Sequence, residues 1–279
     1  MSPESQASEA LPSRRRRTPR GGRHRGAESY LLPPGSPALI LAAPGPATAP
    51  GAAVATELAR LVEIEQTGQP ALVGHLEGTE RHLGAVLAGL RQERPDQPAA
   101  VVVPLTTGPD PEVDAAVRKI VADARAVAAD PLGPHPLIAE ALHDRLAEAG
   151  LARADRVRMM TMVTAASGVI VVTPGDQEAV RQAEVTGVWL SSRLAALVST
   201  ASLGDESAVT TAAAQLRASG AARLAVAPYL IGPETTAERL AAVSAAAGAE
   251  HAAPIGAHPA LAQVAALRYV EALATALAD

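Results

Sequence analysis

The chain carries one succession of short aliphatic runs and turns twice. Three pairs of segments correspond, in the same order and at nearly constant separation: Leu39–Gly45 with Val169–Gly175, Val103–Asp110 with Ala227–Glu234, and Leu132–Leu137 with Ile255–Ala260. Three ordered matches of this kind predict a tandem duplication. A chain of 279 residues is also long enough for two small domains. The sequence therefore predicts two copies of one fold, side by side in one polypeptide.

Each copy consists of aliphatic runs that alternate with Ala-rich stretches of helical length. This pattern predicts parallel strands joined by crossover helices. The expected strands are 38–43, 70–76, 99–104 and 124–129, then 168–173, 193–199, 222–228 and 249–254. The expected helices are 51–66, 79–91, 112–122 and 136–149, then 176–190, 205–219, 234–247 and 259–277. The predicted class is α/β, with two tandem doubly wound lobes, each a four-stranded, mainly parallel sheet flanked by helices.

The expected domain limits follow from changes in composition. Residues 1–36 form a basic tail with seven arginines between positions 14 and 25, residues 37–150 the N-terminal lobe, 151–167 a linker, and 168–279 the C-terminal lobe. The Pro, Gly and Ser around these arginines are typical of a solvated, disordered segment, for which only weak contact with nucleic acid is expected. No secretory signal and no run of 18 apolar residues is found, so we expect a cytoplasmic protein with no membrane partner. The oligomeric state stays open.

Composition excludes several chemistries. The chain has no cysteine, which excludes disulfides, thiolate metal sites and cysteine nucleophiles. Aromatic residues are only 1%, which argues against modules that bind nucleic acid by base stacking. The phosphate-loop, dinucleotide-binding, zinc-protease and nucleophile-elbow motifs are absent. Ligands of open parallel sheets bind beyond the carboxyl ends of the strands, so two facing lobes predict a small-molecule cleft.

The repeated segments resemble a known family. The order and spacing of Leu39–Pro46, Val101–Leu105, Leu132–Leu137, Val226–Leu230 and Gly256–Pro259 are similar to those of the class II tetrapyrrole chelatases in their two-lobed form. These are the sirohydrochlorin ferrochelatases and anaerobic cobalt chelatases of siroheme and cobalamin biosynthesis, and the resemblance runs from about residue 37 to about residue 275. It implies a lyase that inserts Fe²⁺ or Co²⁺ as substrate into a tetrapyrrole, with no permanently bound cofactor.

The resemblance also implies two histidines and a carboxylate, and the sequence departs from that set. Pro44 stands where the first-strand histidine is expected, and Asp110 stands at the position of the second. Glu77 matches the carboxylate that follows the second strand. Proline can neither ligate a metal nor accept a proton. The usual imidazole pair, which suits both tasks because its pKa lies near neutrality, is therefore missing.

A substitute site is expected from the residues that remain. His75 and Glu77 lie two apart at a strand end and so share one face. Together with Asp110 they are the candidate metal ligands, and Glu77 and Asp110 the candidate catalytic carboxylates. The candidate substrate-binding residues lie at strand ends: Pro44, Gly45, Thr106, Thr107, Gly108 and Tyr229. His135 and His258 precede prolines at equivalent helix starts, which indicates a capping role.

Two functions of different class stay open. The first is a chelatase that acts on sirohydrochlorin or a related tetrapyrrole with Fe or Co through a rearranged site. The second is a non-catalytic relative that keeps the cleft as a tetrapyrrole- or metal-binding, regulatory module.

Overall fold

Two four-stranded sheets, each wholly parallel, form the frame of the molecule. The computed structural model describes residues 31–90, 97–153, 165–232 and 235–278. The N-terminal sheet has the order β2-β1-β3-β4 and the C-terminal sheet the order β6-β5-β7-β8. The strands are β1 Ala38–Pro46, β2 Ala71–Glu77, β3 Ala100–Pro104, β4 Ala126–Ala128, β5 Gly168–Thr173, β6 Leu197–Ser202, β7 Leu224–Pro228 and β8 Glu250–His251. The repeated order confirms the predicted α/β fold with two similar lobes.

Helices cover both faces of each sheet, as right-handed crossovers require. They are α1 Ala52–Leu61, continued by the π-helical turn η1 Val62–Thr67, then α2 Leu83–Ala88, α3 Pro111–Ala122, α4 Pro136–Glu148, α5 Gln177–Leu194, α6 Glu206–Ala218, α7 Ala237–Ala246 and α8 Pro259–Ala278. Helices α2 and α3 pack on the outer face of the N-terminal sheet, and α6 and α7 on the outer face of the C-terminal sheet.

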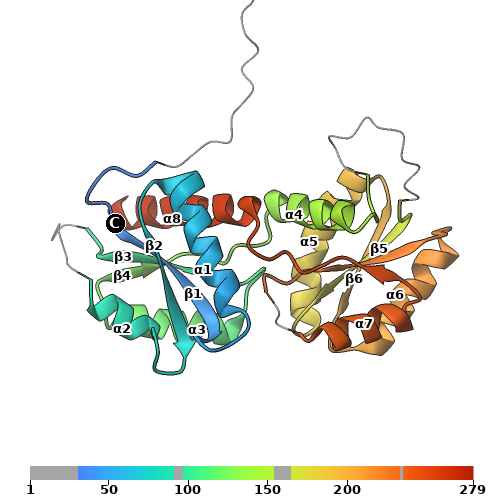
Figure 1. The fold of residues 1–279 in the computed structure, drawn as a ribbon, viewed down its shortest axis with the longest axis horizontal. Coiled ribbons are helices and arrows are strands. Elements are labelled where there is room, and N and C mark those ends of the chain that lie inside the picture. The colour runs from blue at the N-terminus through green and yellow to red at the C-terminus, as the bar shows by residue number, and fades with distance from the viewer. Residues whose placement is uncertain (1–30, 91–96, 154–164, 233–234, 279) are drawn as a thin grey trace, which may run out of the picture.

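The last helix of each half crosses to the other lobe. Helix α4 contacts α5 and β7 of the C-terminal lobe, whereas α8 contacts α1, η1, β3 and β4 of the N-terminal lobe. Figure 1 shows this exchange, with the red α8 beside the N-terminal strands and the green α4 beside α5. The sequence limits 37–150 and 168–279 therefore enclose each sheet but not the helix that completes its cover. The tail to residue 30 and linker residues 154–164 lie outside the described residues.

Because the helices are exchanged, the inner faces of both sheets share one hydrophobic core. It contains Leu41 and Val103 from the first sheet, Val171 from the second, Leu142 of α4 and Leu261 of α8, all buried. Aliphatic side chains make up nearly all of this core, as expected for parallel strands covered on both faces. The two lobes are therefore parts of one packed unit.

Helix α8 is long and apolar enough to cross a membrane by length and composition alone. In this fold it is a core helix. Its residues Leu261, Val264 and Tyr269 are fully buried, and the Tyr269 hydroxyl donates a hydrogen bond to the Pro37 carbonyl oxygen at 2.7 Å. Its hydrophobic length is therefore used to cover the N-terminal sheet.

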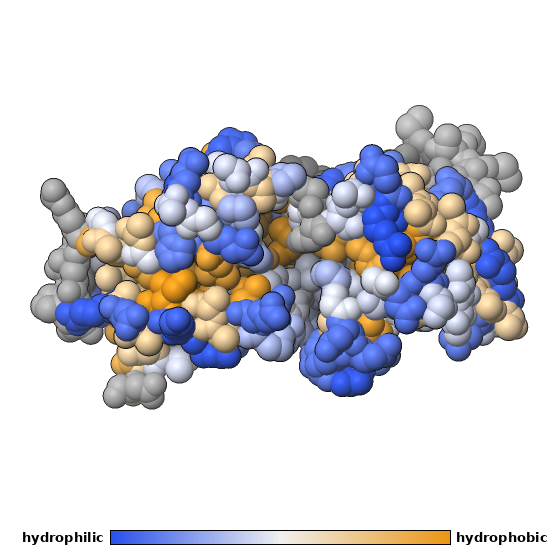
Figure 2. All heavy atoms as spheres, turned by 90° about the horizontal axis from the view of Figure 1, so that it is seen from below, coloured by the Kyte–Doolittle hydropathy of each residue, from blue (hydrophilic) through white to orange (hydrophobic). Residues whose placement is uncertain are grey.

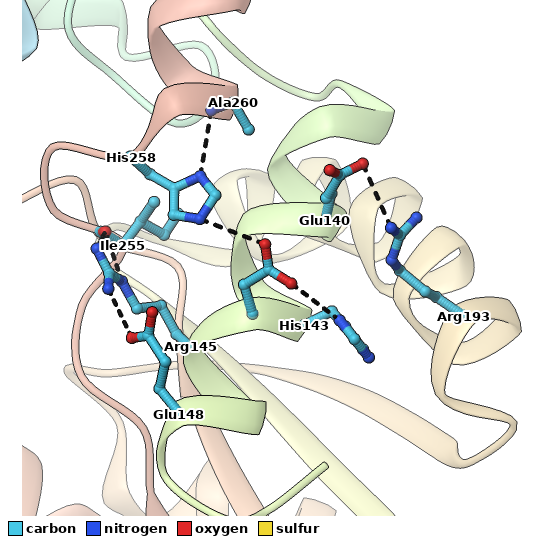
Figure 3. Close-up of polar contacts among 9 residues, drawn as sticks. Glu140, His143, Arg145, Glu148, Arg193, Ile255, His258 and Ala260 are labelled. Carbon is cyan, nitrogen blue, oxygen red and sulfur yellow. Dashed lines mark hydrogen bonds and ion pairs between the residues drawn. The ribbon is translucent and has the colours of Figure 1, made fainter. Parts of the chain in front are cut away.

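Polar contacts join α4 to the segment that leads into α8 (Figure 3). The Arg145 guanidinium donates two hydrogen bonds to the Ile255 carbonyl oxygen, at 2.8 and 2.6 Å. An Asp144 carboxylate oxygen lies 3.5 Å from Nε2 of His258. These contacts fix the angle at which the chain enters α8, since Pro259 begins the helix directly afterwards.

The two predicted histidine caps are confirmed. Nδ1 of His135 accepts a hydrogen bond from the Leu137 backbone N–H at 3.1 Å, and Nδ1 of His258 accepts one from Ala260 at 3.2 Å. Each ring thus satisfies a donor in the first turn of an exchanged helix, which that turn otherwise leaves unpaired. An imidazole can accept in this way only when that nitrogen is unprotonated.

These caps predict a loss of stability in mild acid. Burial lowers the pKa of both rings below the ordinary value of 6.5, helped by Arg268 at His135 and by Arg145 at His258. The unfolded chain therefore binds protons first as pH falls, so the stabilisation is complete above about pH 6.5 and is lost as the pH drops towards the folded-state pKa values. We expect the double variant His135→Asn, His258→Asn, which keeps cap acceptors that do not titrate, to lose less stability than the wild type between pH 7.5 and 5 in urea unfolding. Equal losses would contradict this assignment.

Several element limits differ from the sequence prediction, among them β8, which covers only Glu250–His251 of the expected 249–254. Helix α5 runs to Leu194, so β6 begins at Leu197 rather than at 193. Helix α2 covers only Leu83–Ala88 of the expected 79–91. In α5 the helix-favouring leucine and arginine near its end continue the turn, and Ala195 closes it in a left-handed conformation. Residue 91 lies outside the described part of the chain.

Candidate functional site: an interlobe cleft

The carboxyl ends of strands from both sheets meet at one cleft. Two adjoining pockets lie there, and both are lined by residues of both lobes. They share Pro44, at the end of β1, and Leu105, which follows β3. Figure 2 looks onto the molecule from below and shows apolar residues in the seam between the lobes. This is the location that the strand-end rule predicts for a small-molecule site.

The first, which we call the apolar pocket, has a volume of about 260 Å³. It is lined almost entirely by small or aliphatic residues: Ala43 to Pro46, Ala49 to Ala52, Val54, Ala55, His75, Leu105, Ile231 and Gly232. Ile231 and Gly232 close it from the C-terminal lobe. Among the described residues of this lining, His75 is the one titratable side chain. A surface of this kind favours a flat apolar ligand with one polar feature opposite the imidazole.

His75 reaches the pocket from β2. It lies opposite Ala43 of β1 in the parallel ladder, and only 2% of its surface is exposed. Its Nδ1 is 2.9 Å from the Gly45 carbonyl oxygen. A carbonyl oxygen can only accept, so Nδ1 carries a proton, and in the neutral ring Nε2 has the lone pair. The ring is thus held in one tautomer and one orientation.

Nε2 of His75 is open to this pocket. Within the described part of the chain, Nε2 has no hydrogen-bond partner. Nor is it sealed in the protein, because the only fully buried side-chain N or O atoms found there without a partner are Gln66 Oε1 and Thr106 Oγ1. The pocket lining therefore includes an imidazole nitrogen that has no protein partner among the described residues and that a ligand can reach.

The segment Ala43-Pro44-Gly45-Pro46 shapes the pocket wall. The register between β1 and β2 shifts between Ala43 and Pro46. Proline has no N–H to donate to a strand ladder, so two prolines in this segment are a sufficient reason for the irregularity. The shift leaves the Gly45 carbonyl free to bind His75. Pro44 and Gly45 both line the pocket, while neither has a side chain able to bind metal.

The expected metal centre is not assembled. Across residues 31–90, 97–153, 165–232 and 235–278, no three His, Asp or Glu side chains lie close enough to hold a metal ion. Asp110 caps α3, where its carboxylate accepts hydrogen bonds from Glu112 and Val113 N–H groups at 3.0 and 3.1 Å. Glu77 is exposed and is not part of the pocket lining, although His75 is. The structure therefore does not bring His75, Glu77 and Asp110 together, since His75 lines the pocket, Asp110 caps α3 and Glu77 is exposed.

The second pocket has a volume of about 250 Å³ and contains the other candidate substrate-binding residues. Two of them are used to join the lobes. The Tyr229 hydroxyl donates to the Thr107 carbonyl oxygen at 2.6 Å, and the Thr107 hydroxyl donates to the Tyr229 carbonyl oxygen at 3.2 Å. Burial raises the pKa of Tyr229 to about 12, so the hydroxyl keeps its proton at any physiological pH. Thr107 and Tyr229 therefore offer a ligand their carbon surface rather than their hydroxyls.

The remaining candidates also line this second pocket. Thr106 places its hydroxyl oxygen inside the protein with no partner among the described residues, rather than towards a ligand. Gly108 leaves open space where a Cβ would stand. Sequence reasoning missed Ile231 and Gly232, which close the apolar pocket from the other lobe. Their position in the repeat, equivalent to the loop after β3, was the available signal.

A larger hollow of about 750 Å³ lies away from the cleft, along β6 between α5 and α6. It is lined mainly by short side chains such as Ser199, Thr200 and Ala212, with Glu184 as its one charged group. Its lining, as far as the structure describes the chain, contains no imidazole and no residue from the N-terminal lobe. Among its described lining residues, this hollow therefore lacks the two features of the cleft, an imidazole and walls from both lobes.

Comparisons with known proteins agree with this architecture. Residues 38–149 match the CbiX family. No curated protein sequence matches the chain. Among solved structures, the sirohydrochlorin chelatase SirB from Bacillus subtilis subspecies spizizenii in complex with cobalt is similar, with a TM-score of 0.61 and 12% identity over 85% of this chain and 95% of that one. SirB from Bacillus subtilis with Fe3+ gives a TM-score of 0.60 and 16% identity over 86% and 96%.

The two kinds of similarity cover different parts of the molecule. The family match falls on the N-terminal sheet and its crossovers, including β1, β2 and the loop after β3. The structural match extends over both lobes and nearly the whole of each SirB chain. The chain thus resembles the sirohydrochlorin chelatase family, with an N-terminal lobe that matches CbiX and a two-lobed fold like that of SirB.

Proposed function

We propose that this chain binds a tetrapyrrole in the interlobe cleft and does not insert metal into it at the rate of a chelatase. The observation that carries the proposal is the lining of the apolar pocket, which has aliphatic walls from both lobes and a single imidazole. Aliphatic walls favour the face of a large ring, because its burial removes apolar surface from water. The similarity to SirB in fold supports a ligand of this class.

Metal insertion requires more metal ligands and proton acceptors than line this pocket. A hydrated ion must be bound and stripped of water, and two pyrrole protons must be accepted. Catalytic metal sites typically use three protein ligands, whereas the described residues bring no such set together. A positioned general base typically contributes about 10²–10⁴-fold to a rate. His75 alone cannot hold an ion and accept both protons.

Binding is tested by titrating sirohydrochlorin into the protein and following its absorbance. Gly51 lines the apolar pocket, and a Cβ there would have nothing within 4 Å, so Gly51→Trp can place an indole in the pocket without disturbing the backbone. We expect wild type to bind and Gly51→Trp to bind at least about tenfold more weakly, which corresponds to about 1.4 kcal/mol. Ala53→Trp, on the exposed face of the same helix, is the matched control and should bind as wild type does. No binding by wild type, or equal binding by all three, would refute the cleft as the site.

Metal insertion is tested in the same cuvette by adding Co²⁺ and comparing the rate with that of sirohydrochlorin and Co²⁺ alone. We expect no acceleration beyond about tenfold, since one imidazole supplies at most part of the general-base contribution. Faster insertion that is abolished by Glu77→Gln would show instead that a rearranged chelatase site is active.

A further inference from the structure

We propose that His75 is an axial ligand for a metal that the macrocycle already holds, so that the ligand class preferred by the cleft is a metallated tetrapyrrole. This rests on the proposed function and goes one step further, because it chooses between the free and the metal-bearing ring. The observations behind it are the hydrogen bond that orients the His75 ring and the apolar residues that surround it.

The ring of His75 is prepared as a ligand. Metal-binding histidines usually donate their other N–H to a carbonyl or carboxylate, which fixes the tautomer and the direction of the lone pair. The 2.9 Å contact between Nδ1 and the Gly45 carbonyl oxygen is a contact of this kind. It is formed within a rigid unit, since His75 and Ala43 are paired across β2 and β1. His75 lines the apolar pocket, and its Nε2 has no hydrogen-bond partner among the described residues.

A single imidazole suits a metal that has its other ligands already. A free divalent ion needs several protein donors, and the described residues provide no group of three. A macrocycle contributes four nitrogens in its plane, which leaves only axial positions to fill. One neutral histidine is then sufficient, as in the proximal ligation of haem iron.

The pocket offers few other polar contacts to such a ligand. Neither pocket of the cleft has Lys or Arg in its lining among the residues the structure describes. Carboxylate side chains of a macrocycle therefore gain no ion pair inside these pockets. The metal is therefore the feature by which Nε2 can discriminate between a metallated and a free tetrapyrrole. A free ring has N–H groups or lone pairs at its centre and no metal to which Nε2 can bind.

The binding step is a ligand exchange at the metal. The Nε2 lone pair forms the metal–nitrogen bond, and one axial water leaves. For the neutral ring with its proton on Nδ1 no proton moves, and the metal keeps its oxidation state. The apolar walls favour this exchange because they disfavour the return of the released water to the metal.

The test compares cobalt(II) sirohydrochlorin with the free-base ring, by absorbance titration and by electron paramagnetic resonance. We expect wild type to bind the cobalt form about tenfold more tightly than the free base, which is about 1.4 kcal/mol. We also expect nitrogen superhyperfine splitting from one axial imidazole. In His75→Gln, whose amide can still donate to the Gly45 carbonyl, the preference for the cobalt form and the splitting should both disappear.

The outcomes separate the two proposals. Binding of neither ring by wild type would overturn the proposed function. Equal binding of both rings, or splitting that persists in His75→Gln, would overturn axial ligation by His75 and leave the cleft as a tetrapyrrole site. Glu77→Gln is the control, because Glu77 is an exposed carboxylate two residues from His75 in the chain, and this variant should keep both the preference and the splitting.

Discussion

Replacing Gly133 with alanine is expected to lower the free energy of unfolding by about 3 kcal/mol or more, since overpacking and a lost buried hydrogen bond each cost about 1–3 kcal/mol. Gly133 lies where the lobes join. A Cβ there would overlap the Thr107 carbonyl oxygen, and it would lie 2.6 Å from the Tyr229 hydroxyl oxygen and 2.9 Å from Ile138 Cδ1. The overlapped oxygen belongs to the backbone and accepts the Tyr229 hydrogen bond, so no side-chain rotation relieves the clash. The two lobes would have to move apart at the contact between Thr107 and Tyr229.

Urea unfolding followed by the fluorescence of Trp189 measures this change, because Trp189 is the one tryptophan and packs against the shared core. Gly108→Ala is the matched control. Gly108 lies in the loop that also contains Thr107, and an added Cβ there would meet nothing within 4 Å. We expect its effect to stay within about 0.5 kcal/mol. If Gly133→Ala cost no more than Gly108→Ala, the close approach of the lobes at Thr107 and Tyr229 would be disproved.

Truncating Tyr269 to alanine is expected to destabilise the protein by about 3–5 kcal/mol, the usual cost of removing a large buried aromatic side chain. Tyr269 is 0% exposed, and its hydroxyl donates to the Pro37 carbonyl oxygen at 2.7 Å. Its position in α8 makes the effect informative. The helix belongs to the second repeat but covers the first sheet. The cavity would therefore form in the shared core, beside the N-terminal sheet.

Hydrogen exchange shows where the damage falls. We expect protection to decrease first in β1 and β3 of the N-terminal sheet, far along the chain from the substitution. Tyr269→Phe keeps the ring and removes only the hydrogen bond, so it should cost about 1–3 kcal/mol. Loss of protection confined to β5 and β7 would contradict the helix exchange.

The regular elements were predictable because the repeats carry strong local signals. Aliphatic runs such as Val101–Val103 and Val169–Val172 are strands in the structure, and all of these residues are buried. The helix starts at Pro136 and Pro259 follow from the capping residues before them. The limits of α5 and β6 were less certain, since the residues between 191 and 197 suit either a helix end or a strand start. In the folded structure these residues are helical up to Leu194.

The candidate site was predictable in place but not in composition. The rule for strand ends located the cleft, and His75 does line it. The grouping of His75 with Glu77 and Asp110 failed because sequence spacing does not say what else a carboxylate binds. Asp110 accepts hydrogen bonds from two N–H groups of its own helix, and Glu77, the last residue of β2, is exposed.

The sequence by itself determined the duplicated α/β order, the aliphatic core and the presence of Pro44 and Asp110 where the resemblance implies histidines, since each of these is a property of residue identity and local periodicity. Only the tertiary structure decided that α4 and α8 change lobes, that Thr107 and Tyr229 bind each other, and that the Gly45 carbonyl fixes the tautomer of His75. The physical reason is that these contacts join atoms distant along the chain. Their formation depends on how two apolar surfaces bury each other, which no local pattern specifies.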